Sequence, residues 1–139
     1  MRIVRVMVKT GINKVRITGG EPLTRADLEQ ILAGISSIEG IVDVPMTTNA
    51  IGLAGRLESL CQAGLTRLNI SLDSLVPEKY RRITGSDSLR DVLAGIETAV
   101  KMGIQGKINS VLIRGINDDE IDSLIDLSRD QNGVDFYLD

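Results

Sequence analysis

The chain of 139 residues contains no histidine and no tryptophan, and its single cysteine is Cys61. One cysteine excludes an internal disulfide and any metal site built from cysteines alone. Without histidine, Ser-His-Asp and Cys-His catalysis are excluded as well. Aromatic residues make up only 2% of the chain, so its core must be aliphatic.

Long apolar runs and basic tracts are also missing. No stretch approaches the roughly 18 apolar residues of a membrane span, and residues 1–9 do not resemble a signal peptide. The net charge is −3, which gives no electrostatic reason to expect nucleic acid or an anionic membrane as partner. We therefore expect a cytoplasmic protein that binds any anion through individually placed residues.

A recurring pattern organises what is present: a helical stretch ends at a glycine, an aliphatic residue follows, and a strand begins shortly after. The four glycines are Gly11, Gly64, Gly103 and Gly133. Glycine adopts the left-handed conformation that closes a last helical turn. The pattern predicts strands at residues 15–18, 67–71, 107–113 and 134–138, and a fifth at 42–48.

The predicted helices carry start signals between these strands. Thr24 precedes an amphipathic stretch at 25–37, Pro77 suits the first turn of a short helix, and Asn117 precedes an acidic first turn. Strands that alternate with amphipathic helices predict parallel strands and an α/β fold in one domain.

Polar residues alternate with aliphatic ones along three of the strands. The polar pairs that share a face are Arg16 with Thr18, Asn69 with Ser71, and Lys107 with Asn109. This favours a partial (β/α) TIM-like barrel, open and incomplete, whose lumen holds a polar ligand. The solvated face of an incomplete sheet explains the same alternation. A doubly wound nucleotide fold is disfavoured, because the glycine-rich turn at 18–22 is not G-x-G-x-x-G.

Several exact motifs follow one another in order. Residues 15–23 read VRITGGEPL, and TTN at 47–49, RLNISLD at 67–73, KIN at 107–109 and GINDD at 115–119 follow. Over nearly the whole chain these motifs resemble the radical S-adenosylmethionine (SAM) superfamily, and within it the GTP 3',8-cyclase family. We therefore expect residues 1–139 to be the central part of a radical SAM partial barrel domain.

The resemblance implies specific ligands for this chain. Gly20 and Ser71 would contact SAM, while Arg16, Thr47 and Lys107 would contact GTP. A guanidinium fork and an ammonium group are well suited to phosphate oxygens. Family members are lyases that use SAM and 4Fe-4S clusters to convert GTP to (8S)-3',8-cyclo-7,8-dihydroguanosine 5'-triphosphate in molybdenum cofactor (molybdopterin) biosynthesis.

The chain departs from the family at several places. Both cluster-binding cysteine sets of the family are absent, so we assign no catalytic residue and no metal ligand and expect the isolated chain to be inactive. Ala50 stands where the family has glycine, and Asp135 stands where it has a basic residue.

Other interpretations remain open at this point. The chain could be a non-catalytic nucleotide- or SAM-binding relative or scaffold, or an unrelated barrel enzyme whose base is Glu21 or Asp73. Those two acids could also belong to turns, and Glu21 could meet the ammonium group of SAM. Cys61 is expected to be a small buried hydrophobe. Uncapped strand edges make a homo-oligomer possible.

Overall fold

The computed structural model describes the backbone of residues 1–129 and 136–138 and the side chains of residues 1–128. The predicted junction at Gly133, the start of the strand at 134–138, and Asp135 lie outside the described residues. The helices are α1 (Arg2–Val8), η1 (Pro22–Thr24), α2 (Leu28–Ser36), α3 (Leu57–Gln62), α4 (Pro77–Thr84), α5 (Leu89–Lys101), η2 (Asp118–Glu120) and α6 (Ile121–Arg129). The strands are β1 (Met46–Thr48), β2 (Leu68–Ser71), β3 (Gly106–Asn109) and β4 (Phe136–Leu138).

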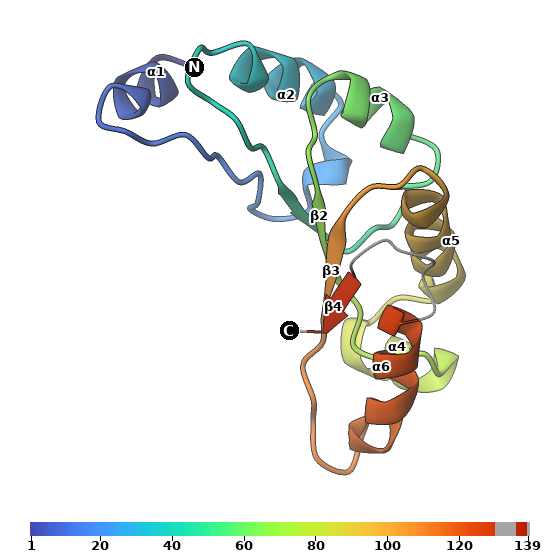
Figure 1. The fold of residues 1–139 in the computed structure, drawn as a ribbon. Helices are drawn as coiled ribbons and strands as arrows, with labels where there is room; N and C mark the ends of the chain where they lie inside the picture. The colour runs from blue at the N-terminus through green and yellow to red at the C-terminus, as the bar shows by residue number, and fades with distance from the viewer. Residues whose placement is uncertain (130–135, 139) are drawn as a thin grey trace.

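The four strands form one parallel sheet in the order β1-β2-β3-β4. Figure 1 shows α2, α3 and α5 along one side of this sheet, with the opposite side uncovered. Parallel strands with helices in the connections confirm the predicted α/β class and the open, partial barrel.

The predicted strand at 15–18 is wrong as a continuous strand. The structure has two isolated parallel bridges there, Lys14 with Asp43 and Ile17 with Met46. The amide of Val15 donates to Asp43 and that of Ile17 donates to Pro45, at 3.0 and 2.8 Å. Pro45 has no N–H with which to return a bond to the carbonyl of Val15, so the ladder is interrupted between the bridges.

Other boundaries also differ from the predictions. The helix expected at 25–37 begins only at Leu28, because η1 occupies Pro22–Thr24 and Arg25 after it has an extended backbone with ψ of 128°. The strands predicted at 107–113 and 42–48 are shorter, as Gly106–Asn109 and Met46–Thr48. Pro77 begins α4 as predicted.

The glycine junctions are confirmed where the structure describes them. Gly11, Gly64 and Gly103 have φ of 94°, 108° and 68°. Ala50 has φ of 60° and is the one described residue other than glycine with a positive φ. The alanine therefore occupies a backbone conformation that favours glycine.

The core lies between the sheet and its helices and is aliphatic apart from Tyr80, which is 2% exposed. Fully buried members include Leu28, Leu32, Leu57, Leu68 and Ile70. Cys61 packs against this core and is partly buried, and this burial raises the pKa of its thiol. The sequence interpretation of Cys61 as a small hydrophobe is thereby supported.

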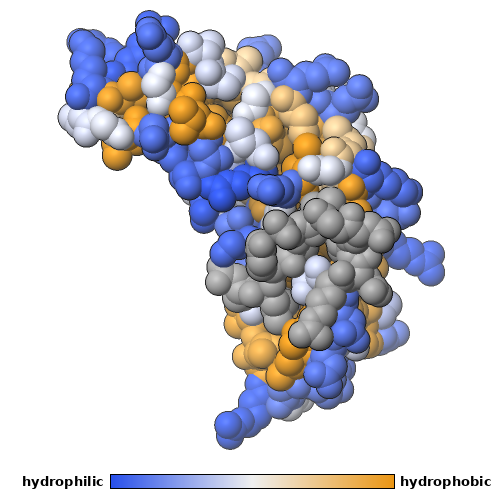
Figure 2. Space-filling view, viewed as in Figure 1, coloured by the Kyte–Doolittle hydropathy of each residue, from blue (hydrophilic) through white to orange (hydrophobic). Residues whose placement is uncertain are grey.

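The first helix stands apart from this core. No residue of α1 is buried, and Ile3, Val6 and Met7 are exposed. Figure 2 shows hydrophobic surface at the α1 end of the molecule. Among the residues that the structure describes, every helix is too short or too polar to span a lipid bilayer.

Candidate functional site

A hollow of about 190 Å³ lies on the polar side of the sheet. It is lined by Arg16, Arg67, Leu68, Asn69, Gln105, Gly106 and Lys107. The structure therefore brings Arg16 and Lys107, which are 91 positions apart in the sequence, to one place. It does so from two elements that the sequence analysis had assigned to the same lumen.

The register of the parallel strands explains this convergence. Thr47, Asn69 and Lys107 are direct partners across β1, β2 and β3, so they form one row across the sheet. All three are half-buried, and their chain neighbours Met46, Leu68 and Ile108 are fully buried in the core. Because side chains alternate along a strand, the row projects to the side away from the helices.

Arg16 joins this row from the edge segment. With the amide of Asn69 oriented so that Oδ1 faces Arg16, Oδ1 accepts a hydrogen bond from Arg16 Nη1 at 3.2 Å, and Nδ2 donates to the carbonyl of Leu68 at 3.2 Å. Asn69 thus holds the guanidinium over the sheet. Thr47 lies in the row but does not line the hollow itself.

Arg67 is a third cation of the hollow that the sequence analysis missed. Its guanidinium forms a two-pronged ion pair with Asp43, which also accepts from Thr66 Oγ1 at 2.6 Å and lies 3.1 Å from Lys14 Nζ. Partial burial alone would raise the pKa of Asp43, but these donors lower it to about 2. The sequence did contain a signal for Arg67, because it alternates with Asn69 and Ser71 along the predicted strand and so shares their face.

Gly20 and Ser71 lie beyond the hollow, at the carboxyl edge of the sheet. Ser71 is the last residue of β2, is half-buried, and pairs with Asn109. Gly20 is exposed in the turn before η1, and apart from its chain neighbours no described atom lies within 4 Å of where its Cβ would be. The carboxyl ends of parallel strands are where α/β folds bind ligands.

Glu21 fixes the glycine turn to the end of β1. Its carboxylate accepts from Thr48 Oγ1 at 2.6 Å, from the Asn49 amide at 2.7 Å and from the Leu23 amide at 3.0 Å. Glu21 therefore caps η1 from the position directly before its first turn.

Asp73 is likewise engaged in backbone contacts. Its Oδ1 accepts from the amide of Val111 at 2.8 Å, so the carboxylate of Asp73 joins the loops after β2 and β3. Both candidate bases of an unrelated barrel enzyme thus accept hydrogen bonds that join distant segments of the fold.

The chain fits one of the two groups that the resemblance implies and does not fit the other. An iron-sulfur cluster needs several thiolates, and the sequence has one cysteine. The described residues also contain no group of three or more His, Cys, Asp or Glu side chains that could hold a metal ion. SAM needs an open approach to backbone and short hydroxyls, and the turn at Gly20 and the hydroxyl of Ser71 offer both.

Comparison with known proteins agrees with this geometry. The family model of the radical SAM superfamily matches residues 1–128. The chain is 49% identical over 128 residues to a GTP 3',8-cyclase of Listeria monocytogenes, which covers 91% of this chain and 38% of that protein. It is 47% identical over 127 residues to a GTP 3',8-cyclase of Aquifex aeolicus, covering 91% of this chain and 39% of that protein. It is also 43% identical over 132 residues to a mitochondrial GTP 3',8-cyclase of Arabidopsis thaliana, covering 94% of this chain and 34% of that protein.

The match has two consequences. An unrelated barrel enzyme is contradicted, because the family model covers most of the chain. The chain also spans well under half the length of these curated relatives. The motifs, the open parallel sheet and the family model together show that this chain belongs to the radical SAM superfamily.

Proposed function

We propose that this chain is the part of a GTP 3',8-cyclase that orients GTP and SAM, and that residues 1–139 are the central part of its partial barrel domain. The longer enzyme would convert GTP to (8S)-3',8-cyclo-7,8-dihydroguanosine 5'-triphosphate in molybdenum cofactor biosynthesis. The names of the relatives support this reaction. The observation that carries the proposal is the shared hollow of Arg16 and Lys107.

The positive charge of the hollow suits a nucleoside triphosphate. Arg16 and Lys107 line it in a chain whose net charge is −3, together with Arg67, whose charge is offset by Asp43. Guanidinium groups can bind phosphate oxygens in pairs, and an ammonium group adds a compact charge. Thr47 supplies a hydroxyl in the same row, so the row would bind GTP through Arg16, Thr47 and Lys107.

The cofactor edge lies next to the substrate row. Ser71 and Asn69 share a face of β2 and are two residues apart, which corresponds to roughly 6–7 Å along a strand. SAM bound at Gly20 and Ser71 would therefore meet GTP bound at Arg16, Thr47 and Lys107. Such placement of two reactants side by side is the contribution that this chain makes to the rate.

The radical chemistry itself needs a 4Fe-4S cluster, which generates the reactive species from SAM when it is bound. This chain has no cysteine set for it, so the chain alone is expected to be inactive. An in-frame cysteine triplet encoded upstream would support the enzyme, and its absence would favour a non-catalytic binding relative. A cytoplasmic location and a homo-oligomeric state stay predictions.

The experiment is calorimetric titration of the folded chain with GTP and, separately, with SAM. We expect both to bind, and we expect Arg16→Ala or Lys107→Ala to weaken GTP binding by about tenfold, because each removes a charge-assisted hydrogen bond. Arg82→Ala in α4 is the matched control, since Arg82 is exposed on a helix. A folded chain that binds no GTP would refute the proposal, as would equal losses in all three variants.

A further inference from the structure

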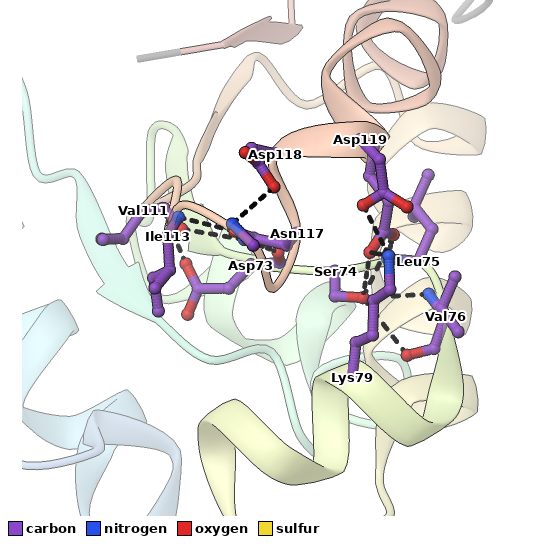
Figure 3. Close-up of polar contacts among 12 residues, drawn as sticks. Asp73, Ser74, Leu75, Val76, Lys79, Val111, Ile113, Asn117, Asp118 and Asp119 are labelled. Carbon is purple, nitrogen blue, oxygen red and sulfur yellow. Dashed lines mark hydrogen bonds and ion pairs between the residues drawn. The ribbon is translucent and has the colours of Figure 1, made fainter.

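The segment that follows Ser71 has no regular structure of its own until α4 begins at Pro77. Its backbone is held instead by the loop that follows β3 and by η2, as Figure 3 shows. The two segments lie 38 to 46 positions apart in the sequence. The segment directly after the proposed cofactor residue is therefore held by contacts from a distant part of the chain.

Asn117 is the centre of these contacts. Its side chain is fully buried, and its Nδ2 donates to the carbonyls of Asp73 at 2.5 Å and Val111 at 2.9 Å. Its Oδ1 accepts from the amide of Ile113 at 2.6 Å. One amide thus satisfies three backbone groups in two loops. Asn117 stands directly before the acidic first turn of η2, as predicted, but its side chain makes these loop contacts and no cap bond to the helix.

Further bonds join the two loops close to Ser71. Ser110 Oγ donates to the carbonyl of Leu72 at 2.5 Å, and the amide of Leu72 donates to the carbonyl of Asn109 at 3.0 Å. The amide of Val111 donates to the carboxylate of Asp73 at 2.8 Å. Leu72 is consequently held through its backbone amide and carbonyl, and Asp73 through its carboxylate and its carbonyl.

A second cluster fixes the far end of the same segment. The carboxylate of Glu120, which is 5% exposed, accepts from Ser74 Oγ at 2.8 Å and from the amide of Leu75 at 2.7 Å. Lys79 Nζ lies 2.6 Å from Asp119 and 3.4 Å from Glu120. Residues 72–75 are thereby attached to the segment 110–120 along their whole length.

We infer that Asn117 is a positioning residue for the SAM site: by joining the loops after β2 and β3 it sets the position of Ser71. This inference rests on the proposed function, because SAM is there assigned to Ser71. Asn117 does not touch the ligand in this account. A site needs its contacting groups held to within about half an ångström, which supporting hydrogen bonds supply. GTP, bound in the row two residues earlier, depends less on this segment.

The test measures the affinities of the full chain for SAM and GTP by calorimetry, with the folded fraction measured by circular dichroism. Asn117→Ala removes all three hydrogen bonds of the Asn117 side chain. Ser110→Ala removes a single hydrogen bond near Ser71 and is the variant to measure if Asn117→Ala does not fold. Glu29→Gln is the matched control, since it breaks hydrogen bonds between α2 and the start of α3 on the helical side.

We expect Asn117→Ala to weaken SAM binding by about tenfold or more beyond any loss of folded protein, the effect typical of supporting hydrogen bonds. Ser110→Ala should weaken SAM binding by about twofold to fivefold. GTP affinity should change by less than about twofold in either variant, and Glu29→Gln should change neither affinity.

The outcomes separate the inference from the proposal on which it rests. SAM affinity that stays unchanged, or falls in step with GTP affinity or with the folded fraction, overturns the inference and leaves the proposed site intact. A folded, unsubstituted chain that binds no SAM refutes the proposed cofactor site and the inference together.

Discussion

With the Asn69 amide turned so that Oδ1 faces Arg16, Oδ1 lies 3.2 Å from Arg16 Nη1, and the edge segment and the second strand meet through a side-chain hydrogen bond on the open side of the sheet. Arg16 is otherwise an exposed residue, and a long arginine side chain at a surface loses conformational freedom when it is held. Asn69 therefore holds the Arg16 guanidinium in place before an anion binds. Because Asn69 pairs with Lys107 across β2 and β3, the two cations lie at the same level of the sheet.

This relationship predicts that Asn69→Ala lowers GTP affinity although Asn69 carries no charge. The loss should be about threefold to tenfold, because one hydrogen bond to a charged group is removed. Asn13→Ala, an exposed asparagine on the same edge segment, should leave GTP affinity unchanged. Calorimetry on both variants checks this, and an unchanged affinity for Asn69→Ala would show that Arg16 needs no support.

The left-handed backbone at Ala50 predicts that substitution by glycine stabilises the fold instead of destabilising it. Ala50→Gly should raise the free energy of unfolding by up to about 1 kcal/mol, since relief of the strained conformation exceeds the added entropy of the unfolded chain. Ala99 is equally buried within α5, so Ala99→Gly should lower the free energy of unfolding by about 1 kcal/mol. Urea denaturation of both variants measures the difference in sign. Destabilisation of similar size in both would contradict a strained Ala50.

Glu21 is expected to contribute to stability through the end of β1. Glu21→Gln replaces an acceptor oxygen by a donor, so at least one of the bonds to Thr48, Asn49 and Leu23 is lost. We expect a loss of about 1–3 kcal/mol in the free energy of unfolding, since Thr48 is buried. Glu58→Gln on the exposed face of α3 is the control and should change little. Equal denaturation midpoints for the two variants would argue against this role.

The ion pair of Glu29 and Arg56 predicts a pH dependence. Hydrogen bonds from Arg56 lower the pKa of Glu29 from its ordinary 4.5 to about 2. The folded chain therefore binds the proton less readily than the unfolded chain, and the stabilisation is complete above about pH 5 and lost as the pH falls toward 2. Both side chains are nearly 30% exposed, so its size should be about 1 kcal/mol.

The measurement is urea denaturation of the unsubstituted chain and of Glu29→Gln between pH 7 and pH 2.5. The difference in unfolding free energy should stay constant above pH 5 and shrink toward zero at the acid end. A difference that is equal at pH 3 and pH 7 would mean that the carboxylate of Glu29 is not the titrating group.

The sequence predicted the parallel α/β arrangement and the shared face of Arg16 and Lys107, because both follow from periodicity and glycine junctions. It did not predict the interrupted edge at 15–18, since that depends on Pro45, which faces the segment only in the fold. Arg67 was missed for a related reason: its side chain is oriented by an ion pair with Asp43, which lies 24 positions away in the sequence.

Asn117 shows the limit of local sequence signals. An asparagine before an acidic turn is typical of a helix cap, and the sequence around it contains nothing that indicates another role. Its partners at Asp73 and Val111 become visible only once the loops after β2 and β3 lie together. The carboxyl edge of the sheet was therefore predictable in position but not in its hydrogen bonds.

The most direct test of one shared site is a single GTP titration of the folded chain followed by nuclear magnetic resonance of the Arg16 and Lys107 side chains. We predict that both signals shift along the titration with the same dissociation constant, while the side chain of Arg82 does not respond. A response of only one of the two cations, or different dissociation constants for the two, would contradict the claim that Arg16 and Lys107 bind the same ligand.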